Sequence, residues 1–289
     1  MEKRKKGFLY SLIGVFLVST NFITAKYGLS QFNPESFCVI WTTASSFYSF
    51  LICLFFKESR KEVFTLRHIR PLTAIGISTG ITMIFGWKGL SLLDPTFTSF
   101  LWRMFPVAVI LAGVIFLKEK LKKEEIAAIG IMLFGSIYSV QGRWNIVGKG
   151  VLFISFAILF CTLQFILAKI YIDRIHPNVM VAYRAAIAAI FVTLWGLFSG
   201  KLMFNAEPRY WLVTLLGAFL GPCASFLFTF RAYRYWELSR ASMLLILQPI
   251  IVLPMAYVFL GTIPEKEELI GGFIILAGAF WLGIIQLRK

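Results

Sequence analysis

The sequence predicts an all-α integral membrane protein with ten transmembrane helices, arranged as two inverted five-helix repeats. Three observations carry this prediction: an apolar composition, ten apolar segments that could span a bilayer, and a self-similarity between positions n and n+143 of the chain. Hydrophobic residues make up 58% of the 289 positions and charged residues 15%, whereas soluble domains carry about 25% charged residues. A single soluble core cannot bury this much apolar surface. The composition therefore excludes an ordinary soluble enzyme, a disordered chain and a disulfide-stabilised scaffold.

Ten segments approach the length of about 20 mostly apolar residues that a helix needs to cross a bilayer. They are apolar on every side, unlike the strands of a membrane barrel, which alternate polar and apolar residues. Connections between them are short, so no loop could hold a soluble domain. In chain order the predicted spans are Phe8–Ala25, Pro34–Phe56, Leu72–Ser91, Thr96–Leu117, Glu125–Gln141, Gly148–Tyr171, Pro177–Phe198, Tyr210–Phe230, Ser239–Leu260 and Leu269–Gln286.

The first predicted span follows the basic residues 3–6, which are similar to the start of a secretory signal peptide. No small-residue cleavage site follows the apolar run, so we expect an uncleaved first helix. The four cysteines all lie inside predicted spans. We therefore expect them to be small packing residues rather than disulfide partners.

Positive charge is unevenly distributed between the two sides of the predicted bundle. When the N-terminus is placed in the cytoplasm, cytoplasmic segments hold 20 of the 29 Lys and Arg residues and outer segments hold 6. Because positively charged loops stay on the cytoplasmic side, we expect both termini there and the chain in the plasma membrane, the inner membrane of a bacterium. The net charge of +15 is thus spread over several short loops, which argues against a nucleic-acid partner.

A repeat of five helices is predicted from residues that recur 143 positions apart. An odd number of spans brings the chain to the opposite side, so the second half, residues 146–289, would be inverted relative to residues 1–145. Inverted repeats that rock about a central site are typical of secondary transporters. Recurring residues include Phe22-Ile-x-Ala-Lys26 with Phe165-Ile-x-Ala-Lys169, Pro34 with Pro177, Pro106 with Pro249, and Gly135 with Gly278.

Four cations lie within the predicted spans or at their edges, where ionisable side chains are costly and mark functional sites by default. Arg103 and Arg184 lie roughly 10 Å inside their spans, on the outer and cytoplasmic sides respectively. Lys88 and Arg231 occupy equivalent repeat positions near opposite membrane surfaces. A cavity that alternates between the two sides would therefore meet a cation in each state. We predict that these residues bind substrate and that the substrate is anionic or bears a carboxylate.

Structural roles compete with substrate binding for each of these cations. Lys88 and Arg231 could extend to the membrane interface or pair with a nearby acid. Arg184 could cap carbonyl groups of a cytoplasmic loop. Arg103 could pair with a carbonyl that Pro106 leaves without a donor.

Aromatic and amide side chains complete the predicted substrate-binding set. Trp41, Trp87 and Trp102 lie deep in spans of the first half and could line an apolar cavity around the cations. Ordinary packing explains each tryptophan equally well. The remaining predicted members of the set are Gln248, Tyr183, Asn21 and Gln164.

Two prolines predict a helix break at equivalent positions of the fourth and ninth spans. Pro106 and Pro249 each remove a backbone donor and leave a carbonyl unpaired, which membranes tolerate where protein or a water-filled cavity satisfies the carbonyl. They could mark a cavity wall, a flexing point or a static kink. Gln248 stands beside Pro249 where the first half has Phe105, so it is a polar group found in one half only.

Groups for catalysis, metal binding or proton transfer are missing from the predicted spans. No Asp or Glu lies in mid-span, both histidines fall in loops, and no Ser/His/Asp arrangement or metal-ligand cluster is present. We therefore expect no enzyme activity, cofactor or metal. Proton relays in membranes need buried carboxylates or histidine as a rule, so the sequence leaves the coupling mechanism open.

The motifs now described resemble EamA domains of the drug/metabolite transporter superfamily. The stretch Asn21-Phe-Ile-Thr-Ala-Lys26, followed by Pro34, is similar to the first-helix signature of that domain. Ser99 with Pro106, followed by Phe116-Leu-Lys-Glu119, resembles its fourth helix and the exit from it. The resemblance covers nearly the whole chain as two tandem domains, and it is specific for fold rather than for substrate.

Further positions support the resemblance, and two depart from it. Gly135 and Gly278 fit the fifth-helix glycine, and Arg184 is similar to an arginine often found in the second domain. Trp41 stands where the first domain would carry an arginine, and Thr262 stands where the second would carry a glutamate. The resemblance implies a ten-helix secondary transporter, often an exporter of metabolites or amino acids.

Together these observations predict a secondary transporter that moves small organic metabolites across the bilayer by alternating access. The first choice is export of an amino acid or of a related metabolite, and the class includes anionic metabolites. Exchange of phosphorylated or nucleotide-linked anions is the alternative within this class. A membrane-embedded enzyme or a lipid-handling protein is the alternative from another class. The expected partners are a small-molecule solute and the lipid bilayer, and the sequence leaves open whether the chain forms a homodimer.

Overall fold

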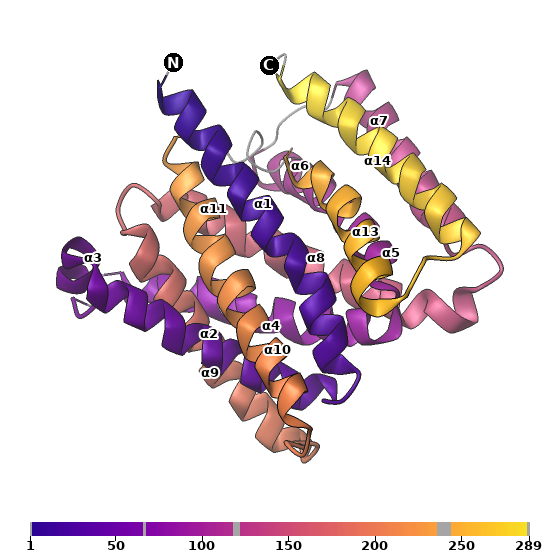
Figure 1. The fold of residues 1–289 in the computed structure, drawn as a ribbon. Helices are drawn as coiled ribbons and strands as arrows, with labels where there is room; N and C mark the ends of the chain where they lie inside the picture. Colours follow the sequence, from indigo (N-terminus) through magenta and orange to yellow (C-terminus); the bar gives the residue numbers. More distant parts are fainter. Residues whose placement is uncertain (1, 66–67, 118–121, 236–243, 288–289) are drawn as a thin grey trace.

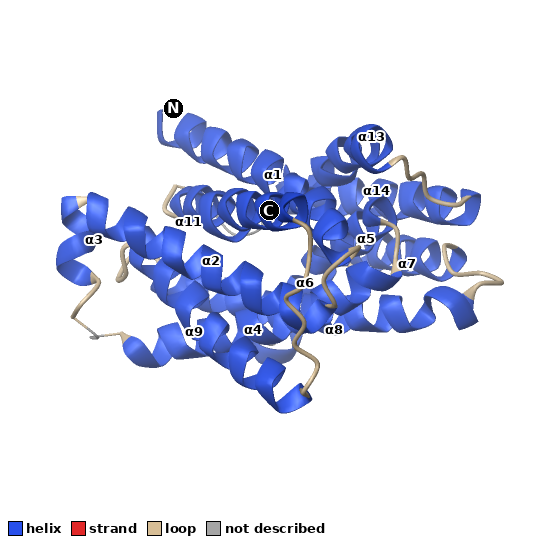
Figure 2. Cartoon of the chain, turned by 60° about the horizontal axis from the view of Figure 1, so that its bottom comes forward, coloured by secondary structure: helices blue, strands red, loops and turns tan. Residues whose placement is uncertain are grey.

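A computed structural model describes residues 2–65, 68–117, 122–235 and 244–287 of the chain. Within these ranges the protein is a bundle of crossing helices joined by short loops, without a β-strand (Figure 2). Lys118 and Glu119 of the predicted fourth-helix exit lie outside the described residues, as do positions 239–243 of the predicted ninth span. The start of α1 (Glu2–Leu29) and the end of α14 (Lys266–Leu287) lie on the same side of the bundle (Figure 1).

The helices follow the predicted segments closely, and three of them contain or adjoin irregular turns. The first half contains α1, α2 (Pro34–Phe55), α3 (Lys57–Glu62), α4 (Ile69–Leu92), α5 (Pro95–Leu101), the 3₁₀ turn η1 (Trp102–Met104), α6 (Phe105–Leu117) and α7 (Lys123–Tyr138). The second half contains α8 (Trp144–Tyr171), α9 (Pro177–Ser199), α10 (Pro208–Ala218), the π-helix η2 (Phe219–Ser225), α11 (Phe226–Tyr233), the 3₁₀ turn η3 (Leu244–Leu247), α13 (Gln248–Leu260) and α14.

Eight helical stretches of the described chain are long and apolar enough to cross a membrane, which makes this a multi-pass membrane protein. Six of them are single helices, and two are composite: α5, η1 and α6 form one, and α10, η2 and α11 form the other. The two remaining predicted spans correspond to shorter helices. α7 has 16 residues, and η3 with α13 forms the shorter apolar helix Leu244–Leu260.

Side-chain caps explain where several helices begin. Asn33, Asp94 and His176 each accept a hydrogen bond from a backbone N–H two or three residues later, and each is followed by a proline at the first helical position. This arrangement satisfies amides that would otherwise lack a partner, and proline suits the first turn because it has no N–H to satisfy. The donor–acceptor distances are 2.9 Å for Asn33, 2.7 and 3.2 Å for Asp94, and 3.2 Å for His176.

Helices of the two halves pack against each other in pairs. α7 packs along α14, α2 along α9, α4 along α8, and α1 along the composite helix of α10, η2 and α11. The pair α7–α14 lies to one side of the bundle, whereas α2 and α9 lie at the opposite side (Figure 1). Interfaces between the halves therefore run through the whole bundle, and the space between them lies near its centre.

Glycines allow the backbones of α7 and α14 to come into direct contact. A Cβ at Gly135 would lie 2.7 Å from the carbonyl oxygen of Gly271, and a Cβ at Gly271 would lie 2.5 Å from that of Gly135. A Cβ at Gly278 would lie 3.1 Å from the carbonyl oxygen of Ala128. Small residues at helix crossings permit this close contact in membranes. Ala128 and Gly135 are the repeat equivalents of Gly271 and Gly278, so the two close contacts are equivalent.

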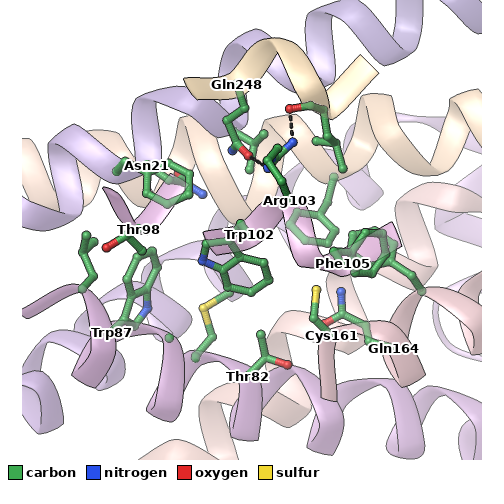
Figure 3. A pocket seen from close by; sticks show the side chains of 18 residues that line it. Asn21, Thr82, Trp87, Thr98, Trp102, Arg103, Phe105, Cys161, Gln164 and Gln248 are labelled. Atoms are coloured by element: carbon green, nitrogen blue, oxygen red, sulfur yellow. Dashed lines mark hydrogen bonds between the residues drawn. The ribbon is translucent and has the colours of Figure 1, made fainter. Parts of the chain in front are cut away.

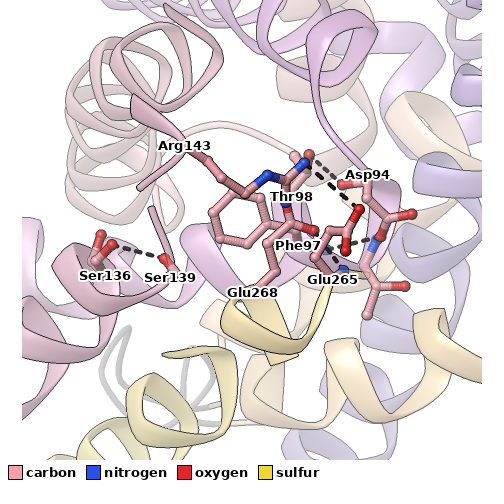
Figure 4. A network of polar contacts seen from close by, with 9 residues as sticks. Asp94, Phe97, Thr98, Ser136, Ser139, Arg143, Glu265 and Glu268 are labelled. Atoms are coloured by element: carbon pink, nitrogen blue, oxygen red, sulfur yellow. Dashed lines mark hydrogen bonds and ion pairs between the residues drawn. The ribbon is translucent and has the colours of Figure 1, made fainter. Parts of the chain in front are cut away.

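An ion pair joins the turn after α7 to the first turn of α14. The Arg143 guanidinium lies 3.0 Å from a carboxylate oxygen of Glu268 and 3.9 Å from one of Glu265 (Figure 4). Glu268 also accepts a hydrogen bond from the backbone N–H of Glu265 at 3.1 Å, which caps the start of α14. The equivalent Glu125 accepts from the backbone N–H of Lys122 at 2.9 Å at the start of α7.

Candidate functional site

A largely apolar cavity of about 130 Å³ lies inside the bundle. Its walls come from α1, α4, α5, η1, α8, α11, η3 and the first residues of α6 and α13, so both halves contribute. Aromatic rings cover much of the lining. These rings belong to Phe22, Trp87, Trp102, Phe105, Phe165 and Phe226. Arg103 and Gln248 meet on one side of the cavity, and Cys161 and Gln164 lie on the opposite side (Figure 3).

Twelve of the eighteen residues that line the cavity form pairs separated by 143 positions. Such pairing is expected where two structurally equivalent halves face a shared axis, because each half then presents the same positions to the centre. The pairs are Val18 with Cys161, Asn21 with Gln164, Phe22 with Phe165, Met83 with Phe226, Trp102 with Leu245, and Phe105 with Gln248.

Arg103 is buried beside this cavity and links the two halves. Its Nε donates to the carbonyl of Ser99 at 3.2 Å, within its own helix. Its two terminal nitrogens donate to the carbonyl of Leu245 in η3 and to the side-chain oxygen of Gln248. Among the residues that the structure describes, no carboxylate lies within ion-pair distance of Arg103. Its hydrogen bonds are therefore largely satisfied while its positive charge is not neutralised.

Helix irregularities place Arg103 and its partners. Arg103 lies in η1, and Pro106 is the second residue of α6 directly after this turn. Gln248 and Pro249 open α13 directly after η3. A 3₁₀ turn changes the direction of side chains and frees carbonyl oxygens at its junction with an α-helix. The carbonyl that accepts the hydrogen bond from Arg103 is that of Leu245, at the proline break of the second half. It does not belong to the break at Pro106, which the sequence suggested.

Three polar atoms of lining residues are buried and have no hydrogen-bond partner within the described part of the chain: Asn21 Oδ1, Gln164 Nε2 and Trp87 Nε1. The Gln164 side-chain oxygen lies within hydrogen-bond distance of the Thr79 hydroxyl, whose single hydrogen can instead be donated to the carbonyl of Ile75 at 2.8 Å. Gly221 makes room for Asn21, because a Cβ there would lie 1.6 Å from Asn21 Oδ1. An unpaired buried polar atom costs about 1–3 kcal/mol. These atoms have almost no accessible surface in this conformation, and Asn21 Oδ1 is packed against Gly221, which does not line the cavity, so a ligand or water could reach them only after a rearrangement.

Arg184 lies behind the cavity wall rather than in it. It is fully buried in α9, and its terminal nitrogen donates to the carbonyl of Pro222 at 2.5 Å. Its guanidinium carbon lies 3.7 Å from the centroid of the Phe226 ring, and Phe226 lines the cavity. Arg184 therefore makes no direct contact with the cavity in this conformation. Its Nε and its other terminal nitrogen lack a partner among the described residues.

Four other predicted site residues lie away from this cavity. Lys88 Nζ lies 3.3 Å from a carboxylate oxygen of Glu35, so Lys88 pairs with an acid of α2 rather than with Asp94, the next acid along the chain. Trp41 is fully buried in the aromatic cluster around Trp87, with ring centroids 5.3 Å apart. The two remaining residues are Tyr183, whose hydroxyl donates to the Val63 carbonyl at 2.6 Å, and Arg231, which lines a separate pocket.

The comparisons with known proteins agree with this arrangement of two related halves. The model of the EamA-like transporter family matches the chain twice, over residues 5–141 and residues 148–284. This chain belongs to the EamA-like transporter family. The resemblance inferred from the sequence motifs is thereby confirmed, and membrane transport of small molecules, rather than an enzymatic role, is the activity to which the family points.

Two further similarities concern individual proteins. The EamA-like chain is 22% identical over 226 residues to the "Uncharacterized transporter YxxF" of Bacillus subtilis (strain 168), which covers 76% of this chain and 72% of that protein. A protein of known crystal structure superposes with a TM-score of 0.69 over 98% of both chains, at 16% sequence identity. At this identity the second match shows a shared fold.

Sequence reasoning missed several lining residues of this EamA-like protein that the repeat itself could have identified. Phe22 and Phe165 belong to the recurring motif, and Cys161 lies one helical turn before Phe165 on the same helix face. Phe226 was missed because it follows the π-helix η2, which contains Pro222 and has no counterpart in the first half. Apolar residues inside an apolar span carry no individual signal, so only their repeat partners could reveal them.

A second, smaller chamber of about 50 Å³ adjoins the main cavity. The two share Val18, Phe165, Phe226 and Leu245 in their walls. Phe165 and Phe226 are stacked at the shared wall, with ring centroids 5.6 Å apart and planes inclined by 12°. The small chamber further contains Ser225, Thr229 and Tyr233, which stand 143 positions after Thr82, Gly86 and Leu90 of the main cavity. The chambers are thus equivalent parts of the two halves with unequal volumes.

The described residues contain no group of three or more His, Cys, Asp or Glu side chains that could hold a metal ion. Cys38, Cys53, Cys161 and Cys223 are all buried and free. Of these, Cys161 alone lines the main cavity. Its thiol therefore offers a native chemical probe for access to that cavity.

Proposed function

We propose that this EamA-like protein is a secondary transporter that works by alternating access. The observation that carries the proposal is the central cavity, whose lining consists largely of residue pairs separated by 143 positions. A site on the axis between two equivalent halves can open to either side when one half rocks against the other. The unequal chambers on the two sides of the Phe165–Phe226 stack fit one of the two resulting states.

The proposal includes ten membrane-crossing segments in two inverted repeats, residues 1–145 and 146–289. α7 and the helix of η3 and α13 would supply the two segments that are shorter than a full span. Equivalent contacts on both sides of the axis support this arrangement. The approach of Gly135 to Gly271 is repeated by Gly278 and Ala128. Five crossings in each repeat would then orient the second repeat opposite to the first.

The main cavity and the small chamber point toward opposite ends of α1. The main cavity reaches Leu90, near the end of α4, and the small chamber reaches Tyr233, the last residue of α11. In the opposite state, Phe22 and Met83 would close together, because they are the equivalents of Phe165 and Phe226. The volumes would then exchange between the two ends. With α1 starting in the cytoplasm, as the charge bias predicts, the present state faces outward.

The substrate that fits the cavity best is a small amphipathic solute with a polar end, such as an amino acid or a related carboxylate. Aromatic walls suit its apolar part, and the unneutralised charge of Arg103 suits a carboxylate. The amide side chains of Asn21 and Gln164 line the cavity and could pair with further polar groups of a solute once they reorient. The volume of about 130 Å³ lies below the roughly 300–1,000 Å³ of pockets for drug-sized ligands. This size disfavours a nucleotide-linked anion. We further propose that the physiological direction is export.

Transport assays in proteoliposomes test the site and the substrate class together. Radiolabelled amino acids, related carboxylates and phosphorylated anions would be offered with and without a pH gradient. We expect saturable uptake of an amino acid or carboxylate, and at least about tenfold slower uptake in Arg103→Gln, a loss of about 1.4 kcal/mol. Arg209→Gln is the matched control, because Arg209 is exposed and pairs with Glu207. Equal uptake by Arg103→Gln and the parent would refute the role of Arg103.

Cysteine labelling tests the proposed orientation in the plasma membrane. The experiment uses a Cys161→Ser background, because Cys161 lines the cavity that is proposed to face outward. The other three native cysteines are buried, so a membrane-impermeant thiol reagent should react mainly with cysteines introduced at exposed positions. We expect Lys201→Cys to be labelled in intact cells and Lys57→Cys only after permeabilisation. The reverse pattern would place the termini outside and overturn the orientation derived from the charge bias.

A further inference from the structure

A second pocket, of about 410 Å³, lies at the end of the bundle near the first turns of α1 and outside the central cavity. It is formed by the first part of α1, the junction of α2 with α3, the start of α9 and the end of α11. Three cations, Lys57, Arg231 and Arg234, line it together with one carboxylate, Glu58. With His176 neutral, the lining carries a net positive charge.

The hydrogen bonding of His176 fits the neutral form. Its Nδ1 accepts the backbone N–H of Asn178 at 3.2 Å, which a protonated imidazole could not do. Its Nε2 lies 3.7 Å from a carboxylate oxygen of Glu58, so Glu58 is engaged at the edge of the pocket. The three cations of the lining therefore outnumber its one carboxylate.

The opposite end of the bundle shows what this pocket lacks. Arg231 and Asn178 are the repeat equivalents of Lys88 and Glu35, 143 positions further along the chain. At the first position the ammonium of Lys88 lies 3.3 Å from the Glu35 carboxylate, which neutralises it. At the second, Arg231 donates to the amide oxygen of Asn178 at 3.1 Å. The contact geometry is kept while the acid is replaced by a neutral amide, so Asn178 holds Arg231 in place without neutralising its charge.

No carboxylate lies within ion-pair distance of Arg231 or Arg234 in the part of the chain that the structure describes. Arg231 is half-buried, and Arg234, one turn further along, is exposed. Arginine presents several N–H groups in a rigid plane, which suits the oxygens of a phosphate group. The rings of Tyr10, in α1, and Tyr235, just after α11, stand 5.9 Å apart in the same pocket, and tyrosines are enriched at the level of lipid headgroups.

We propose that this pocket binds a phosphate group between Arg231 and Arg234, separately from the transported solute. The phosphate could belong to the headgroup of an anionic phospholipid or to a soluble phosphate. Basic pockets between membrane helices are known to hold anionic headgroups. Because Asn178 replaces the acid at one end only, the site exists at the α1-start end of the bundle and has no counterpart at the other end.

Binding measurements on the purified full-length protein test this site in two arms. The first arm titrates inorganic phosphate and follows the thermal midpoint. The second arm measures retention of phosphatidylglycerol, with phosphatidylcholine as the neutral comparison, by native mass spectrometry. We expect binding in at least one arm. Arg231→Gln should weaken it about tenfold or more, as expected for the loss of a charge-assisted hydrogen bond. Lys88→Gln, the equivalent position at the other end, is the matched control and should leave it unchanged.

Two further variants separate loss of binding from loss of folding. Asn178→Glu introduces the acid that the other end carries, so it should keep the thermal midpoint without ligand but abolish binding. Arg234→Gln alters an exposed side chain and should weaken binding without affecting the fold. Retention of phosphatidylglycerol alone would assign the site to a lipid headgroup, whereas competition by phosphate would assign it to a soluble anion. Absence of binding in both arms, or unchanged affinity in Arg234→Gln or a folded Asn178→Glu, would overturn the proposal.

Discussion

Lys26 donates a hydrogen bond from its Nζ to the carbonyl oxygen of Leu90 at 2.9 Å, at the C-terminal end of α4. The same ammonium donates to two further carbonyls just beyond, at 3.2 and 2.6 Å. Lys169 donates in the same way to the carbonyl of Tyr233 at 2.7 Å, at the end of α11. Both members of the second pair stand 143 positions after the first. The last carbonyls of a helix have no partner within it. Each lysine therefore caps the C-terminal end of a helix that lines one of the two chambers.

Removal of the Lys26 ammonium should therefore destabilise the protein. Lys26→Met keeps a similar side-chain length but leaves the carbonyls of α4 without their donor, so we expect a loss of about 1–3 kcal/mol. Thermal unfolding in detergent can be followed with a thiol-reactive dye, because the four buried cysteines become accessible when the chain unfolds. Lys149→Met, at an exposed position, should leave the midpoint unchanged. Equal midpoints for the two variants would contradict the capping role.

The depth of a side chain in the membrane could be predicted from the sequence, but the face of its helix could not. Arg103 and Arg184 lie at similar depths along their spans, yet only Arg103 reaches the cavity and Arg184 lies behind Phe226. A span that is apolar on all sides has no polar stripe to fix its rotation. Asn21 and Gln164, both members of the predicted substrate-binding set, line the same cavity because a repeat axis brings equivalent positions together, and their binding of a substrate stays a prediction.

The π-helix η2 also escaped prediction, and it decides where a polar group goes. Pro222 gave no warning of a π-helix, because a proline within a span is compatible with a simple kink. The carbonyl of Pro222 accepts a hydrogen bond from Arg184, and this bond holds the arginine outside the cavity. Arg231 was expected to bind substrate together with Lys88. Instead, Arg231 contacts Asn178 in the same way as Lys88 contacts Glu35. The two contacts lie at opposite ends of the bundle, and neither lies in the cavity.

The crossing of α7 and α14 should not tolerate a methyl group. Gly271→Ala would place a Cβ 2.5 Å from the backbone carbonyl oxygen of Gly135, which cannot rotate away as a side chain could. We expect a loss of about 1–3 kcal/mol from the forced separation of the helices. Gly130→Ala in the same α7 is the matched control, because nothing lies within 4 Å of its Cβ position. Thermal midpoints in detergent provide the measurement, and a neutral Gly271→Ala would show that the helices separate easily.

The Phe165–Phe226 stack should restrict access to the cavity from the end where α1 begins. Phe226→Ala removes one ring of the stack and joins the small chamber to the main cavity. We expect Cys161, which lines the main cavity, to react several-fold faster with an impermeant thiol reagent in inside-out vesicles. Phe156→Ala, at an exposed position of α8, serves as the control for loss of a ring. Cys161→Ser identifies the labelled residue. An unchanged rate in Phe226→Ala would show that this stack is not the barrier.

His176 should make the stability of the protein depend on pH below neutrality. Burial, and next the positive charge of Arg234, lowers the pKa of His176 below 6.5, against the opposing effect of Glu62 and Glu58 and with a further contribution from Arg231. The unfolded chain therefore takes up a proton at a higher pH than the folded chain does. Stability should be fully present above pH 6.5 and should decline as the pH falls from there toward the lowered pKa.

The chain itself supplies the control for this dependence. Asn33 is the repeat equivalent of His176 and caps α2 through a side-chain oxygen that does not titrate in this range. His176→Asn should therefore keep the cap on α9 and lose the part of the pH dependence that His176 contributes. Thermal midpoints of the parent and His176→Asn, measured between about pH 5 and 8, should diverge only at the acidic end. Parallel curves over the whole range would show that the His176 imidazole keeps its ordinary pKa in the folded protein.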